Sequence, residues 1–82
     1  MGSAAKRASL ATILIVEDEF LARALLSDHL QGCGFMAFEA TNADEAISTI
    51  EGGIPIDLLS LAISRKFVDV RDFGSGCLRV VA

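Results

Sequence analysis

The segment Ile13–Phe20, with the sequence ILIVEDEF, decides the fold of this chain. Its first four residues are branched aliphatic, which is typical of a strand buried on both faces in a parallel sheet. Three carboxylates, Glu17, Asp18 and Glu19, follow where the strand ends. Because ligands bind at the carboxyl edge of open α/β sheets, these acids are candidate ligands for Mg²⁺. The alternative is an acidic turn that caps the next helix, where negative charge favours the helix dipole.

Length and composition bound the class of protein. The chain has 82 residues, fewer than the roughly 100–200 of an average domain, so we expect one small domain. A hydrophobic content of 52% is sufficient for a core. The net charge of −4 argues against a nucleic-acid partner. No apolar run approaches the roughly 18–20 residues that cross a bilayer, so we predict a cytoplasmic protein without a membrane partner.

The histidine and the two cysteines indicate little chemistry. Cys33 and Cys77 are far apart in the sequence, so we expect reduced structural thiols rather than a disulfide or a metal site. His29 is the only histidine and continues an apolar stripe, so we expect a partly buried imidazole rather than a ligand or a pH-sensitive group. An enzyme that uses Cys33, His29 or the acid cluster is disfavoured, because the spacing indicates no nucleophile–base pair.

A helical period follows the acids. Apolar side chains three and four positions apart predict one face of an amphipathic helix. They are Ala22, Leu25, Leu26 and Leu30. Asp18 or Glu19 lies near the start of this helix, and the Gly32–Gly34 segment supplies glycine where helices commonly end.

Two more strands and one more helix are predicted downstream. Phe35–Ala40 is rich in bulky apolar residues and predicts a second strand. Asn42, with Glu45 three residues later, is typical of a helix N-terminus with a capping box, and Gly52 predicts the end of that helix. Asp57–Ile63 predicts a third strand.

The order strand, helix, strand, helix, strand predicts an α/β fold, in which residues 12–63 form a βαβαβ half of a parallel, doubly wound sheet. We expect residues 1–11 to be a disordered N-terminal tail. Residues 64–82 form a divergent C-terminal segment that we expect to be irregular, because it has no convincing period before the turn at Gly74–Gly76. Cys77–Ala82 is a candidate for one last short strand.

Four pieces of the chain, in this order and spacing, resemble the receiver domain of bacterial two-component response regulators over residues 12–61. The pieces are Ile13–Glu19, Gly32–Phe35, Ala40–Ala46 and Ile56–Leu59. The resemblance implies a flavodoxin-like fold with strand order 2-1-3-4-5. It also implies that Glu17 and Asp18 belong to a pocket that binds Mg²⁺, and that a nearby aspartate accepts phosphate from a histidine kinase.

The chain departs from the family at the position of that aspartate, which falls on Ala62. A methyl group has no oxygen to attack phosphorus, so no acyl phosphate can form there. Ser60 is expected to lie about 6–7 Å short of the acidic end, at ~3.3 Å per residue of strand. Ser64 is expected nearer the acids, but a serine phosphate is a stable ester and a poor relay. We therefore expect a receiver-like domain that is neither an enzyme nor phosphorylated itself.

The sequence after Ser64 does not resemble a receiver, which suggests a truncated or frame-shifted gene. We expect this to leave the third strand as an exposed edge through which copies associate. The expected partner is a histidine kinase or another receiver domain. The alternatives are a non-catalytic interaction module, acting as a decoy or a dimerising pseudo-receiver, and a non-functional truncated product.

Overall fold

The structure is a computed structural model that describes residues 11–81. The predicted N-terminal tail lies outside the described residues except for Ala11. This residue is half-buried, and its carbonyl oxygen accepts a hydrogen bond from the Met36 amide at 3.3 Å. Ala11 therefore belongs to the fold and not to a tail.

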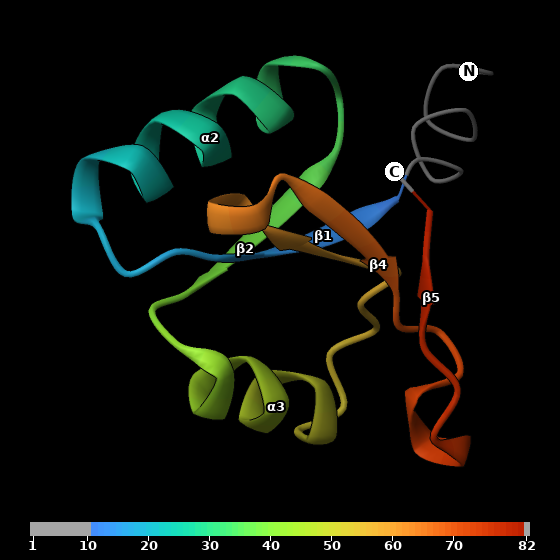
Figure 1. The fold of residues 1–82 in the computed structure, drawn as a ribbon. Helices are drawn as coiled ribbons and strands as arrows, with labels where there is room; N and C mark the ends of the chain where they lie inside the picture. Colours follow the sequence, from blue (N-terminus) through green and yellow to red (C-terminus); the bar gives the residue numbers. More distant parts are fainter. Residues whose placement is uncertain (1–10, 82) are drawn as a thin grey trace, which may run out of the picture.

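The described chain is an α/β structure in which one helix lies on each face of a single sheet (Figure 1). In chain order the elements are β1 (Thr12–Val16), α2 (Phe20–Gly32), β2 (Met36–Ala40), α3 (Ala43–Glu51), β3 (Leu58–Leu61), the 3₁₀ turn η1 (Ala62–Ser64), β4 (Lys66–Asp69), the 3₁₀ turn η2 (Phe73–Ser75) and β5 (Arg79–Val80). The predicted strand–helix–strand–helix–strand order is confirmed.

The sheet is mixed, with the strand order β2-β1-β3-β4-β5. β1 pairs in parallel with β2 and with β3, whereas β3, β4 and β5 pair antiparallel. The strands within residues 12–63 are parallel, as expected, but the antiparallel β4 and β5 mean that the flavodoxin-like half is not confirmed. A parallel neighbour needs a crossover of a dozen or more residues. Here β3 and β4 are joined by η1 and by Arg65, which adopts a left-handed φ of 55°.

The C-terminal segment is not the irregular tail that we expected. Residues 66–69 form β4, which pairs with β3 from Leu58 opposite Asp69 to Leu61 opposite Lys66. The candidate last strand exists as β5, and it pairs with β4. The predicted exposed edge at β3 is wrong, because β3 is hydrogen-bonded on both sides. The two edges of this sheet are β2 and β5.

β1 is the centre of the core, as its apolar sequence predicts. Ile13 and Ile15 pack with Leu30 beneath α2, and Leu14 packs on the opposite face with residues from α3, β4 and the loops. The three β1 side chains are at most 2% exposed. Burial on both faces accounts for the uniformly apolar sequence from Ile13 to Val16.

The helices begin and end close to the predicted positions, but the packed face of α2 is rotated from the predicted one. Leu26 and Leu30 pack on the sheet, while Leu25 is 68% exposed and His29 is exposed. The prediction of a partly buried His29 is thus wrong. α3 ends at Glu51, with Gly52 as its C-cap, before Gly53 turns the chain with φ of 97°.

Candidate functional site

The acids that follow β1 lie close to Ile63, the second residue of η1, at one edge of the sheet. Glu17 and Asp18 line a cavity of about 260 Å³, together with Val16, Thr41, Asn42 and Ile63. These residues follow or end β1, β2 and β3, whose carboxyl ends lie together because the three strands are parallel. Both predicted metal ligands therefore share one cavity at the predicted edge.

Glu17 is held in place by three interactions with neighbouring elements. Its amide donates to the carbonyl oxygen of Ala40 at 3.0 Å, which continues the pairing of β1 with β2. Its carboxylate Oε2 accepts from the Glu19 amide at 2.9 Å, and its carbonyl oxygen accepts from Arg23 Nη1 at 2.8 Å. Glu17 is half-buried as a result. One carboxylate oxygen is already engaged by the chain itself.

The third acid has a structural role. Glu19 is the N-cap of α2, and its carboxylate accepts hydrogen bonds from the amides of Leu21 at 3.2 Å and Ala22 at 2.7 Å. These amides belong to the first turn, where a helix lacks internal acceptors. The reading of the acids as a helix cap is therefore confirmed for Glu19. Asp18 and Glu19 are both exposed, but the carboxylate of Glu19 is engaged by the helix.

The donor set fits a weakly held, largely hydrated Mg²⁺. This ion is commonly bound through one or two carboxylates with several waters retained. Asp18 and the second oxygen of Glu17 could supply those carboxylates, and the metal would neutralise negative charge at this edge. Two observations argue for a low affinity for Mg²⁺. Within residues 11–81 no three metal-ligating side chains lie together, and the Arg23 guanidinium lies beside the backbone of Glu17.

Arg23 links the acidic edge to β2. Its Nε donates to Glu39 Oε1 at 3.2 Å, and its guanidinium lies 5.6 Å from the centre of the Phe20 ring. Its side chain is only 12% exposed, so the positive charge is fixed close to the cavity. This residue was not singled out in the sequence. The sequence feature that could have indicated its place near the acids is its position one helical turn after Glu19.

Ala62 is separated from the acids. It begins η1 and lines a different cavity with Leu26, Ser60, Arg65 and Phe67. The neighbouring Ile63, which is 92% exposed, lines the acidic cavity instead. The position that the family resemblance assigns to the phosphate acceptor therefore carries a methyl group and lies outside the acidic cavity.

Neither serine considered as a substitute acceptor lines the acidic cavity. Ser60 is buried on the α2 side, and Ser64 is exposed, with its hydroxyl donating to the Leu61 carbonyl at 3.4 Å. The wall opposite Glu17 comes from Thr41 and Asn42, which sequence reasoning treated only as the start of a helix. Their position directly after β2 could have indicated that they lie at the same edge of the sheet as the acids.

Thr41 and Asn42 are fixed by Glu45. The carboxylate Oε1 of Glu45 accepts from the Thr41 amide at 2.7 Å and from its hydroxyl at 2.8 Å, while Asn42 Oδ1 accepts from the Glu45 amide at 2.9 Å. The hydrogen bond from the Thr41 amide, followed by that from the Thr41 hydroxyl, lowers the pKa of Glu45 from its ordinary value of 4.5. The predicted capping box is present, with Glu45 reaching Thr41 rather than Asn42.

Both cysteines are exposed. Cys33 is the C-cap of α2, and its Sγ lies 4.0 Å from His29 Nε2. Cys77 is also free and exposed. Within residues 11–81 neither thiol is bonded to another cysteine.

Comparison with known proteins identifies no similar protein. No protein family matches the chain, and neither curated proteins nor solved structures contain a match. Among residues 11–81, neither helix is long and apolar enough to cross a bilayer.

Proposed function

We propose that this chain is a receiver-like module of a bacterial two-component phosphorelay, which binds a histidine kinase or another receiver but does not accept phosphate. The observation that carries the proposal is the composition of the carboxyl edge. The acidic pair Glu17 and Asp18 is retained in a cavity there, while the acceptor position holds Ala62. A domain with this edge can keep the metal-binding and partner-binding parts of a receiver without its chemistry.

The strand arrangement supports the same proposal. β2, β1 and β3 are parallel neighbours in the order that the receiver resemblance implies. The antiparallel β4 and β5 lie beyond the part of the chain that carries the resemblance. The proposal therefore rests on residues 12–61 and on the edge that they form.

A phosphodonor experiment tests the chemistry. The purified chain is incubated with acetyl phosphate and Mg²⁺, and its intact mass is measured beside that of an intact receiver domain. We expect the intact receiver to gain a phosphoryl group and this chain to gain none, because Ala62 supplies no nucleophile. Phosphorylation at any residue of this chain, Ser64 included, would overturn this part of the proposal.

Partner binding is tested separately. Phe20, Leu21 and Leu25 expose large apolar side chains on α2. Leu21 and Leu25 are four residues apart and so lie on the same face of the helix, and an exposed apolar face supports a docking role. We expect phosphotransfer domains of histidine kinases to bind the chain, and the Leu21→Glu variant to bind them less tightly than the Asp28→Asn control. A set of such domains that ignores the chain, while binding intact receivers, contradicts the proposal.

A further inference from the structure

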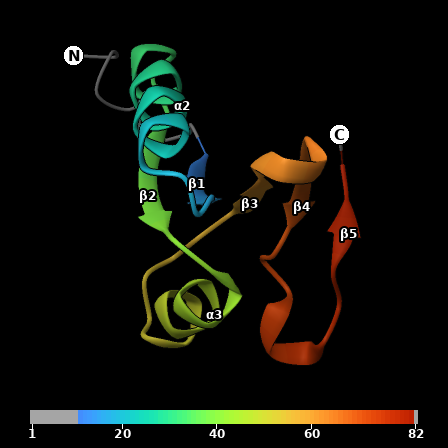
Figure 2. The same cartoon turned by 60° about the vertical axis from the view of Figure 1, so that its left-hand side comes forward.

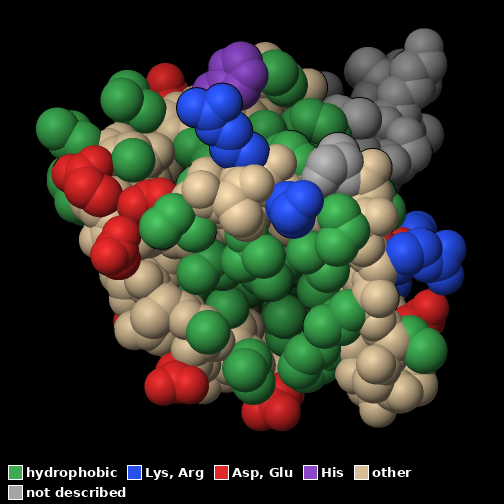
Figure 3. Space-filling view, in the orientation of Figure 1, with side chains coloured by type: hydrophobic (Ala, Val, Ile, Leu, Met, Phe, Trp, Pro, Cys, Tyr) green, Lys and Arg blue, Asp and Glu red, His purple; other side chains and the backbone are tan. Residues whose placement is uncertain are grey.

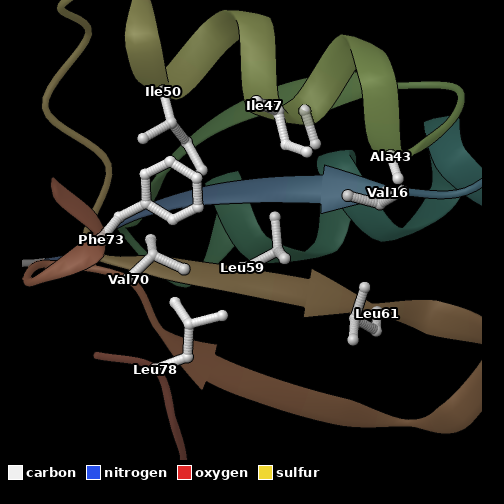
Figure 4. A pocket seen from close by; sticks show the side chains of 10 residues that line it. Val16, Ala43, Ile47, Ile50, Leu59, Leu61, Val70, Phe73 and Leu78 are labelled. Carbon is white, nitrogen blue, oxygen red and sulfur yellow. The ribbon is translucent and has the colours of Figure 1, made fainter. Parts of the chain in front are cut away.

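An apolar groove lies between α3 and the β3–β4 half of the sheet (Figure 4). It has a volume of about 200 Å³, and all of its lining residues are apolar. Ile47 and Ile50 of α3 form one wall, Leu59 and Leu61 of β3 form the floor, and Phe73 and Leu78 close the end nearest η2. A wall without polar atoms is unsuited to a polar small molecule and suited to apolar side chains.

The groove exists because a single helix covers this face of the sheet. α3 packs on β2 and β1, and Figure 2 shows it set apart from β4 and β5. In the space-filling view the apolar side chains form a continuous area at the centre of this face (Figure 3). Large apolar areas on a small chain commonly mark protein interfaces.

The far wall is also apolar, as the sheet register shows. Val68 of β4 belongs to the core on the α3 side, and Val80 lies directly opposite it on β5. Side chains directly opposite in antiparallel strands point to the same face. Leu78 and Val80 are each 57% exposed, and they extend the apolar area beyond the groove.

Opposite charges lie outside the apolar lining of the groove, one on α3 and one on β4. Asp44 lies one helical turn before Ile47 on the exposed side of α3. Lys66 shares a face with Val68 and lies opposite Leu61, so it borders the groove on the β4 side. Figure 3 shows acidic side chains below the apolar area, over α3, and basic side chains above it.

We propose that a second copy of this chain occupies the groove, related by a two-fold axis that runs along it. This axis places α3 of each copy against β4 and β5 of the other. It carries Asp44 of one copy to Lys66 of the other, and the contact occurs twice because a two-fold interface is self-complementary. The apolar walls supply the affinity and the charges supply the register. This inference goes beyond the proposed function and does not rest on it.

Sedimentation velocity over a range of concentrations tests the interface. We expect the wild-type chain to dimerise and the Ile47→Glu and Leu78→Glu variants to be monomers. Met36→Glu is the matched control, because it adds the same charge at an exposed apolar residue of β2, at the sheet edge opposite β5, and it is expected to dimerise like the wild type. Circular dichroism checks that each variant is folded. A folded wild-type chain that stays monomeric at millimolar concentration overturns the proposal.

A charge exchange tests the register without altering the apolar walls. Asp44→Lys and Lys66→Glu each place like charges across the interface, and each is expected to raise the dimer Kd by about tenfold. Mixing the two variants restores both opposite-charge contacts, so a heterodimer near wild-type affinity is expected. Equal Kd values for the mixture and the separate variants would contradict this register. The dimer Kd values do not depend on phosphorylation or on kinase binding. A failure of this inference can therefore be told apart from a failure of the proposed function.

Discussion

At the scale of single residues, the three adjacent acids have three different environments. Glu19 caps α2, Glu17 is hydrogen-bonded to the turn and to β2, and Asp18 is exposed and lines the cavity. The sequence predicted an acidic edge because carboxylates follow a buried strand. It could not divide their roles, since this depends on which amides the turn directs at each carboxylate.

The cap can be tested by a single substitution. Glu19→Ala removes the acceptor for the amides of Leu21 and Ala22, so we expect a loss of about 1 kcal/mol in the free energy of unfolding. Urea denaturation measures the loss. Asp28→Ala is the control, because Asp28 is an exposed acid within the same helix and is expected to change stability little. Equal effects of the two variants would show that Glu19 does not cap the helix.

Asp69 predicts a pH dependence of stability. The side-chain hydrogen bond from Arg71 Nε at 2.9 Å, with further help from the Arg71 amide, holds the pKa of Asp69 well below its ordinary value of 3.8. The unfolded chain therefore binds the proton first as the pH falls. The contribution of Asp69 is complete above the unfolded pKa and is lost progressively below it.

We expect Asp69→Asn to reduce this acid-dependent loss of stability. Unfolding in urea at several pH values between neutrality and the acid limb measures it. Asp28→Asn serves as the control for removing one negative charge. A wild-type stability that falls no more steeply with acid than that of Asp69→Asn would contradict the role of the Arg71 hydrogen bonds.

At the scale of elements, the sequence predicted those with strong local signals. Ile13–Val16 is uniformly apolar, and Asn42 with Glu45 marks the start of α3, so these elements were found close to their true bounds. β4 was missed because its four residues alternate Lys, Phe, Val and Asp, which places one apolar side chain on each face. So short a pattern is visible only once β3 provides the partner strand.

The rotation of α2 has a similar cause. The apolar residues of this helix surround much of its circumference, so the period indicates a helix but does not fix which side packs. The sheet selects the side of Leu26 and Leu30, which contact Ile13 and Ile15. The cavity residues Thr41, Asn42 and Ile63 were missed because their proximity arises from the parallel pairing of three strands.

β4 offers a direct test of the mixed sheet. Val68 is 8% exposed and packs in the core on the α3 side, so we expect Val68→Ala to cost about 2 kcal/mol of unfolding free energy. Val81→Ala removes the same two methyl groups from an exposed residue and is expected to cost much less. Chemical denaturation compares the two. Equal costs would indicate that residues 66–69 do not form part of the core.

At the scale of the whole molecule, two chemically different cavities of the same sheet carry the two proposals. The carboxyl edge of β1, β2 and β3 gathers acids and hydroxyl or amide groups around one cavity. The face between α3 and β5 gathers apolar side chains around another. The first supports a receiver-like role without phosphorylation, and the second supports association of two copies.

The most direct test of the proposed function is a Mg²⁺ titration followed by ¹⁵N–¹H correlation spectra of the wild type and of Asp18→Asn. We predict that the amides of residues 17–20 and of Thr41 and Asn42 shift with Mg²⁺ in the wild type. Asp18→Asn, which loses a carboxylate at the cavity, should lose most of this response, while Asp28→Asn should retain it. Spectra of a folded chain that ignore Mg²⁺, or that respond equally with and without Asp18, would contradict a retained receiver-like edge.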